Sequence, residues 1–193
     1  KAVTQNVILR FLTDDNAAVN ALKSGDVDVL SPVNATLAKS LDAKTYKVSA
    51  ADGSDKYVLA FNCTNAKLSD KRVRQAIRYA INHKEIIASR ADVDYALGGP
   101  IPSVDPGYED LTEQYQYDLD KAKSLMAAAG YSTDKPLTLT LTYANTYGTE
   151  LGDQLRTQPD DIGIELNINY VEFSPWLQDV HANGDYEPSM ANN

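Results

Sequence analysis

The residues in this sequence best suited to chemistry are two histidines and one cysteine. His83 and His181 lie far apart, and their surroundings lack the ligand spacing typical of a zinc site. Cys63 follows a predicted strand in the stretch NCTN, with no histidine or basic pair nearby to activate a thiol. We therefore predict no metal site and no catalytic cysteine, and we expect the histidines to have surface or helix-capping roles.

Paired carboxylates are the second group that could do chemistry. Asp14 and Asp15 precede a predicted helix, where acidic side chains cap the first turn, and Asp160 and Asp161 lie near the end of another helix. The acidic stretch 105–120 lacks the spacing of a calcium loop, and no phosphate-binding glycine motif or GxSxG motif is present. We predict no cofactor, no catalytic residue and no enzyme; a hydrolase with scattered carboxylates remains the alternative.

A cluster of cations is the third group, in the stretch DKRVRQAIRYAINHKEII at residues 70–87. Such a helix could bind an anion or nucleic acid, or it could be a scaffold helix with a solvated back. The formal net charge of −9 repels polyanions on average, so we exclude nucleic acid as a partner. An apolar stripe at helical spacing favours the scaffold helix: Val73, Ala76, Ile77, Ala80 and Ile81.

Twelve tyrosines accompany only three phenylalanines and one tryptophan. Tyrosine offers a flat apolar ring with a hydrogen-bonding end, which suits a wet recognition cleft. Tyrosine could equally replace phenylalanine at half-buried positions. Composition leaves both interpretations open.

Strands and helices alternate in the first part of the chain, which favours an α/β fold. NVILRFL at 6–12 and VDVL at 27–30 have the short apolar runs of strands. Between them a helix capped by Asp14 or Asp15 is predicted to end at Gly25, and Asn34 is expected to cap the next helix.

The remainder begins after the polar stretch at 49–56. KYVLAFN at 56–62 is predicted as a strand, and LTLTLTY at 137–143 alternates strictly and is the strongest strand signal. IELNINYVEF at 164–173 alternates as well, and a last helix is expected with Ser174 as its N-cap. We therefore expect two strand–helix pairs after a helical middle.

Several blocks occur in an order that resembles a known family. KYVLAFNCTN, SDKRVRQAIRYAINHKEII, GGPIPSVDPGY, YQYDLDKAKSLMAAAGY and IGIELNINYVEFSPWL are similar to segments of the extracellular solute-binding proteins of family 5. These are the oligopeptide-, dipeptide- and nickel-type binding proteins of ABC importers. The resemblance departs at Pro159, where the family has an apolar helical residue, and at Pro188, where it has an apolar strand residue.

The resemblance implies a two-lobed α/β fold of the type II periplasmic-binding-protein kind. Residues 1–55 would be a segment of the first lobe and the hinge approach, and residues 56–193 a truncated second ligand-binding lobe. The family is longer, so we expect the chain to be a fragment. As a whole, the protein would capture a peptide or similar solute and deliver it to a membrane permease, as an exported, periplasmic or cell-surface monomer with a possible lipid anchor.

The resemblance also implies ligand contacts. Tyr143, Asn145 and Tyr147, at the end of the LTLTLTY strand and its loop, occupy a place where relatives contact ligand. Asn62 and Thr64, after the KYVLAFN strand, are weaker candidates. A receptor or assembly module that uses the same lobe remains a further alternative.

Overall fold

The computed structural model describes residues 3–31, 33, 35–90 and 94–192. The chain divides into two compact units. The first comprises Lys1–Ala51 with Arg90–Val93, and the second comprises Asp52–Ser89 with Asp94–Asn193. The assignment of residues 1–55 and 56–193 to two lobes stays a prediction.

The first unit contains helices α1 (Asp15–Ser24) and α2 (Ala35–Lys39). The Asp14 carboxylate accepts a hydrogen bond from the Ala17 N–H, and Gly25 ends α1 in the left-handed conformation, as predicted. The expected capping residue Asn34 lies outside the described residues.

The two predicted strands of the first unit are wrong for this structure. Residues 6–12 and 27–30 are irregular, and apolar residues that a strand would bury face solvent, such as Phe11, which is 91% exposed, and Val29, which is 80% exposed. A short apolar segment becomes a strand only when a neighbouring strand accepts its backbone hydrogen bonds. Within the described residues, none pairs with these segments.

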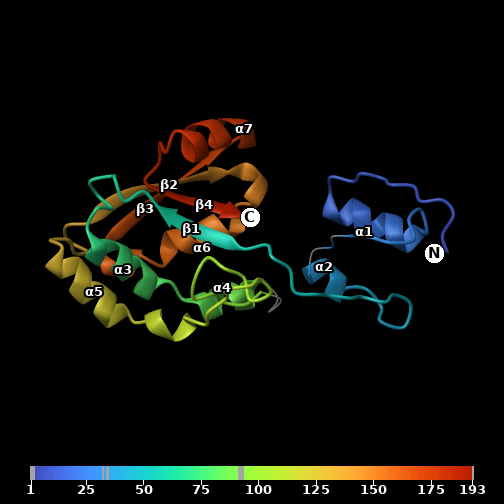
Figure 1. Ribbon diagram of the computed structural model, residues 1–193, viewed down its shortest axis with the longest axis horizontal. Coiled ribbons are helices and arrows are strands. Elements are labelled where there is room, and N and C mark those ends of the chain that lie inside the picture. Colours follow the sequence, from blue (N-terminus) through green and yellow to red (C-terminus); the bar gives the residue numbers. More distant parts are fainter. Residues whose placement is uncertain (1–2, 32, 34, 91–93, 193) are drawn as a thin grey trace. The chain divides into compact units, whose positions relative to one another are not determined.

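The second unit is built on a four-stranded sheet in the order β1-β4-β2-β3 (Figure 1). The strands are β1 (Tyr57–Phe61), β2 (Leu137–Ala144), β3 (Ile164–Val171) and β4 (Pro188–Asn192). β2 runs parallel to both β3 and β4, whereas β1 is antiparallel to β4. The predicted mixed α/β architecture is confirmed.

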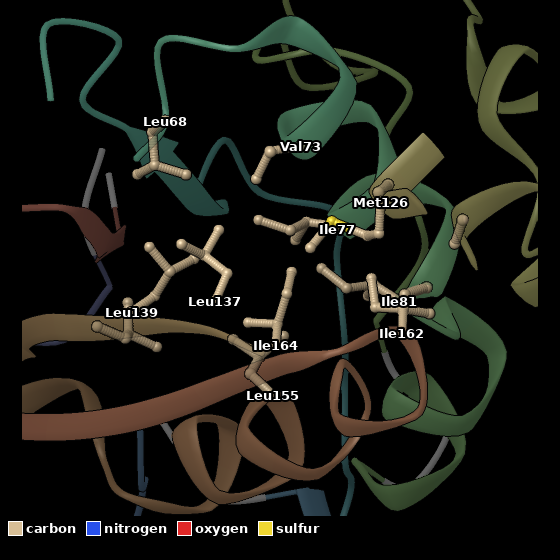
Figure 2. Close-up of a cluster of buried hydrophobic side chains, with 14 of the residues drawn as sticks. Leu68, Val73, Ile77, Ile81, Met126, Leu137, Leu139, Leu155, Ile162 and Ile164 are labelled. Atoms are coloured by element: carbon tan, nitrogen blue, oxygen red, sulfur yellow. The ribbon is translucent and has the colours of Figure 1, made fainter. Parts of the chain in front are cut away.

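Three helices cover the apolar face of this sheet: α3 (Lys71–Ala80), α5 (Leu119–Ala128) and α6 (Glu150–Thr157). Because side chains alternate along a strand, the odd-numbered residues of β2 all point into this layer. Figure 2 shows labelled leucine and isoleucine side chains of the sheet facing Val73, Ile77 and Met126 of the helices. The predicted apolar stripe of α3 is buried in full.

Shorter elements connect this framework. α4 (His83–Ser89) follows α3, and the Asn82 side chain accepts a hydrogen bond from the Glu85 N–H at 3.3 Å, while the Asn82 N–H donates to the Gln158 side chain at 2.9 Å. The long loop that follows contains only the 3-10 turn η1 (Thr112–Tyr115) among its described residues. On the other face of the sheet, α7 (Phe173–Trp176) continues into the π-helix η4 (Leu177–Ala182).

Two arginines of α3 bind main-chain carbonyl groups. Arg72 pairs with Asp70 at 2.6 Å and donates to the Ala128 carbonyl, at the end of α5, at 2.6 Å. Arg74 donates to the carbonyl groups of Leu68 and Ser69 at 2.7 and 2.9 Å. These hydrogen bonds give partners to carbonyl groups of the neighbouring segments. We therefore interpret α3 as a scaffold helix whose arginines bind the protein itself and not an anionic ligand.

Two prolines that depart from the family pattern have ordinary places in the fold. Pro159 follows α6 and is the N-cap residue of the 3-10 turn η3 (Asp160–Ile162), a place that suits a residue without a backbone N–H. Pro188 is the first residue of β4, a position where a missing N–H is tolerated. Both residues line one apolar hollow together with Leu59, Phe61, Ile77, Ile81, Leu139, Leu155, Ile164 and Leu166.

Glu187 directly precedes β4, and its side chain supplies hydrogen-bond acceptors next to β2. One carboxylate oxygen accepts a hydrogen bond from the Thr140 N–H at 2.7 Å, and the other pairs with Lys67 at 2.6 Å. We expect Glu187→Ala to lower the free energy of unfolding by about 1 kcal/mol, because the Thr140 N–H loses its acceptor. Urea unfolding measures the change. Glu187→Gln keeps an acceptor and should cost less; equal losses would assign the effect to the ion pair instead.

His83 is half-buried and contacts Arg78, whose guanidinium nitrogen lies 3.0 Å from its Nδ1 atom. His83 is the first residue of α4, and its ring is only partly exposed. Burial, and then the positive charge of Arg78, lowers the pKa of His83 below its ordinary value of 6.5. In the unfolded chain, the His83 imidazole therefore takes up a proton near pH 6.5, whereas in the folded chain it takes up this proton only at lower pH.

The stabilising contribution of neutral His83 is consequently complete above pH 6.5 and is lost as the pH falls through the lower, folded pKa. We expect the free energy of unfolding to fall from about pH 7.5 to about 5.5 in the wild type and to fall less in His83→Gln. Denaturant titrations at both pH values measure this difference. His181→Gln, at an exposed histidine, is the matched control. A wild-type slope retained in His83→Gln would contradict the assignment.

None of the helices in the described part of the chain has the length and apolar character that crossing a bilayer requires.

Candidate ligand-binding site

The carboxyl ends of three strands meet at one edge of the sheet. β2, β3 and β4 run in the same direction, so Ala144 pairs with Val171, and Tyr143 pairs with Met190 near the end of β4. The antiparallel strand β1 starts at this edge, with Tyr57 opposite Asn192. Loops at the carboxyl edge of parallel strands are the usual place for a ligand in open α/β sheets.

The 3-10 turn η2 (Asn145–Tyr147) forms the loop at this edge. Asn145 is exposed, and its Nδ2 atom donates to the Glu172 carboxylate at 2.8 Å. Tyr147 is half-buried, with its ring perpendicular to those of Trp176 and Phe173 at centroid distances of 5.5 and 6.5 Å. Burial raises the pKa of Tyr147, so its hydroxyl is a neutral group at physiological pH.

Tyr143 lies beneath this loop in the core. Its side chain has no exposed surface, its hydroxyl donates to the Gly148 carbonyl at 3.0 Å, and its ring meets Tyr170 edge-on at 5.1 Å. Burial, and next the hydrogen bond with Tyr170, raises the pKa of Tyr143. In this structure Tyr143 supports the loop from below, and its contact with ligand stays a prediction.

Asn62 and Thr64 lie away from this edge. The Asn62 N–H donates to the Glu187 carbonyl, which places Asn62 level with Thr140 of β2. With a rise of about 3.3 Å per residue, this level lies about 16 Å along the strands from Asn145. The structure therefore brings Asn145 and Tyr147 together and leaves the other pair apart.

The side chain of Asn62 is fully used by the protein itself. Its Nδ2 atom donates to the carbonyl groups of Gly184 and Tyr186 at 3.0 and 2.9 Å, and its Oδ1 atom accepts from the Thr64 N–H and hydroxyl at 3.1 and 2.6 Å. These bonds tie the end of β1 to the segment before β4. Ligand contacts by Asn62 and Thr64 stay predictions.

The residues that hold η2 in place were not predicted from the sequence. Glu172 follows β3 and binds Asn145, while Phe173 and Trp176 pack around Tyr147. The predicted N-cap Ser174 is wrong, because α7 starts two residues earlier with Glu172 as its N-cap. Only the single tryptophan, placed directly after a strand, could have drawn attention to this cluster.

Among the residues that the structure describes, no group of three or more histidine, cysteine or carboxylate side chains could hold a metal ion. Cys63 is an exposed free thiol. The edge around η2 offers the neutral groups of Asn145 and Tyr147, the Glu172 carboxylate and aromatic rings, which can bind a small molecule.

The family of bacterial extracellular solute-binding proteins, family 5 Middle, matches the chain over residues 1–193. The chain belongs to this family. Heme-binding protein A of Haemophilus influenzae is 32% identical over 127 residues, which cover 65% of this family 5 chain and 23% of the relative. The dipeptide-binding protein of Pseudomonas aeruginosa is 25% identical over 195 residues, covering 96% and 36% of the two chains.

Solved structures agree on the fold, which is that of type II periplasmic binding proteins. NikA from Brucella suis, in complex with Fe(III)-EDTA, superimposes with a TM-score of 0.81 at 18% identity, over 94% of this family 5 chain and 40% of NikA. The chain thus spans about a quarter to two fifths of the length of these relatives. These two relatives are named as heme-binding and dipeptide-binding proteins, which supports a non-enzyme interpretation of the family.

Proposed function

We propose that this family 5 chain is part of the substrate-binding component of an ABC importer. It captures a peptide or similar small solute in a cleft between two lobes and delivers it to a membrane permease, without chemical turnover. Residues 1–55 belong to the first lobe and residues 56–193 to the second. The protein acts as a monomer outside the cytoplasmic membrane, in the periplasm or lipid-anchored at the cell surface. Family membership and the names of relatives support the proposal.

One observation assigns specific residues to the proposed function. Asn145 and Tyr147 lie on a loop at the carboxyl edge of the sheet, which is held by the hydrogen bond to Glu172 and by packing on Trp176. Asn145 is exposed and its Nδ2 atom donates to Glu172, so its Oδ1 atom is the acceptor that the side chain can offer a ligand. The neutral Tyr147 hydroxyl can donate. A peptide backbone offers both an N–H and a carbonyl, so such a pair recognises the backbone rather than side-chain charge.

Calorimetry and thermal-shift titrations with alanine peptides of two to nine residues test the proposal. We expect a peptide to raise the melting temperature and to be recovered intact by mass spectrometry. Haem and Ni(L-His)2 serve as separate probes. Binding of these probes alone would contradict the peptide assignment, and peptide cleavage would favour the hydrolase.

Two matched variants locate the site. Tyr147→Phe removes one hydrogen bond but keeps the ring, so we expect peptide affinity to fall by about 1 kcal/mol, or about fivefold. Tyr117→Phe makes the same change at an exposed tyrosine of the long loop and should leave affinity unchanged. Equal behaviour of the two variants would exclude a Tyr147 contact. Thr64→Ala tests separately whether the second group of candidates contacts ligand.

A further inference from the structure

Trp176 joins the candidate ligand loop to the body of the sheet. Its ring is 5% exposed and contacts Tyr147 on one side, at 5.5 Å and 90°, and Phe173 on another, at 5.9 Å and 29°. Its indole Nε1–H donates to the Ser189 hydroxyl at 3.2 Å in a buried hydrogen bond. We propose that Trp176 is the positioning residue that holds the loop Asn145–Tyr147 in its ligand-accepting conformation; this inference rests on the proposed function.

The hydrogen bond to Ser189 fixes the plane of the indole. Ser189 lies in β4 and, among the described residues, is the polar side chain buried in the core, with 3% exposed. A buried hydroxyl in an apolar layer needs a partner, and the indole N–H supplies it. Rotation of Trp176 would break the hydrogen bond between its indole N–H and the Ser189 hydroxyl. The indole ring is therefore held in one orientation against Tyr147.

The packing of Trp176 extends to the base of the loop. Trp176 clusters with Ala144, the last residue of β2, and with Val180 of η4, and Tyr147 packs against this cluster. The helix changes from α to π directly after Trp176. Turns of π-helix are rare and are frequent at functional sites, because they displace side chains from ordinary helical positions.

Two hydrogen bonds of the loop act on groups other than the Tyr147 ring. The hydrogen bond between Asn145 and Glu172 is exposed to water, and the bond from Tyr143 holds the main chain at Gly148. Neither fixes the rotamer of Tyr147. The aromatic packing around Trp176 holds the ring, and the main chain of Asn192 contacts the hydroxyl end. A binding group held in one rotamer loses less conformational freedom when ligand binds.

Hydrogen–deuterium exchange of the ligand-free chain tests the inference without a ligand. We expect Trp176→Leu to accelerate amide exchange at residues 145–149 while exchange in α3 stays near the wild-type rate. Trp176→Phe keeps an aromatic ring and should restore most of the protection. Val73→Ala, in the core on the opposite face of the sheet, controls for general destabilisation and should not accelerate the loop selectively. Unchanged exchange at 145–149 in Trp176→Leu would overturn the inference.

Calorimetry with trialanine then links position to binding. If the loop adopts its competent conformation about a tenth of the time in Trp176→Leu, affinity falls about tenfold. Loss of loop protection with unchanged trialanine affinity would overturn the positioning role and leave the proposed function intact. Absence of any peptide binding by the wild type would overturn the proposed function, and with it the link to binding.

As Trp176 is the single tryptophan, its fluorescence on addition of trialanine should change in the wild type and not in Tyr147→Ala.

Discussion

Gly163→Ala is expected to lower the free energy of unfolding by about 3 kcal/mol, the largest loss we expect from any single substitution proposed for this chain. Gly163 connects η3 to β3 with φ of 80°, in the left-handed region that side chains disfavour. An added Cβ atom would lie 2.4 Å from the carbonyl carbon of Ser132. This neighbour is main chain, held in place by mutual hydrogen bonds between Ser132 and Lys135, so it cannot move aside at low cost.

Gly130→Ala separates the two causes of this loss. Gly130 follows α5 with φ of 92°, but no atom beyond its chain neighbours and the helix backbone lies within 4 Å of the position that an added Cβ atom would take. We expect a loss of about 1 kcal/mol from the left-handed conformation alone. Chemical denaturation of both variants measures the difference. Equal losses would mean that the segment around Ser132 moves freely and that the close approach has no energetic role.

Gly152→Ala should lower the free energy of unfolding by about 2 kcal/mol and should disturb the ligand loop as well. Its Cβ atom would lie 2.2 Å from the Tyr143 hydroxyl oxygen, which donates to the Gly148 carbonyl. The tyrosine side chain is fully buried in the close-packed core, so moving it displaces its neighbours. Displacing its hydroxyl therefore breaks the hydrogen bond that supports the main chain after η2.

A double-mutant cycle with Tyr143→Phe tests this explanation. Phenylalanine lacks the oxygen that meets the new methyl group, so Gly152→Ala should cost less in the Tyr143→Phe background than in the wild type. Denaturant unfolding of the four proteins gives the coupling energy. Additive losses would show that the methyl group clashes with other atoms and that the Tyr143 hydroxyl is not the cause.

Elements with strong local patterns could be predicted from the sequence. The stripe of α3 and its cap Asp70 specify a helix by themselves, and the alternation in residues 137–143 specifies β2. The apolar runs at 6–12 and 27–30 carry equally clear patterns, yet they are not strands here. A strand depends on a partner that its own residues do not encode, whereas a helix bonds to itself.

The candidate site was less accessible to prediction. Tyr143 shares the parity of Leu137, Leu139 and Leu141, so strand alternation already placed it on the buried face. The separation of Asn62 from Asn145 depends on β1 running antiparallel to β4, and no local pattern specifies that direction. The packing of Trp176 on Tyr147 joins two segments after different strands, and only the three-dimensional arrangement brings them together.

The apolar hollow that Pro159 and Pro188 share has a consequence for the history of this sequence. The resemblance predicts another apolar residue at each of the two positions, and both line the same hollow although one follows α6 and the other begins β4. A close-packed interior couples the volumes of residues around such a space, because a gain at one wall is tolerated when another wall recedes. Across related sequences we therefore expect the side-chain volumes at these two positions to vary together, with a larger residue at one position accompanied by a smaller residue at the other.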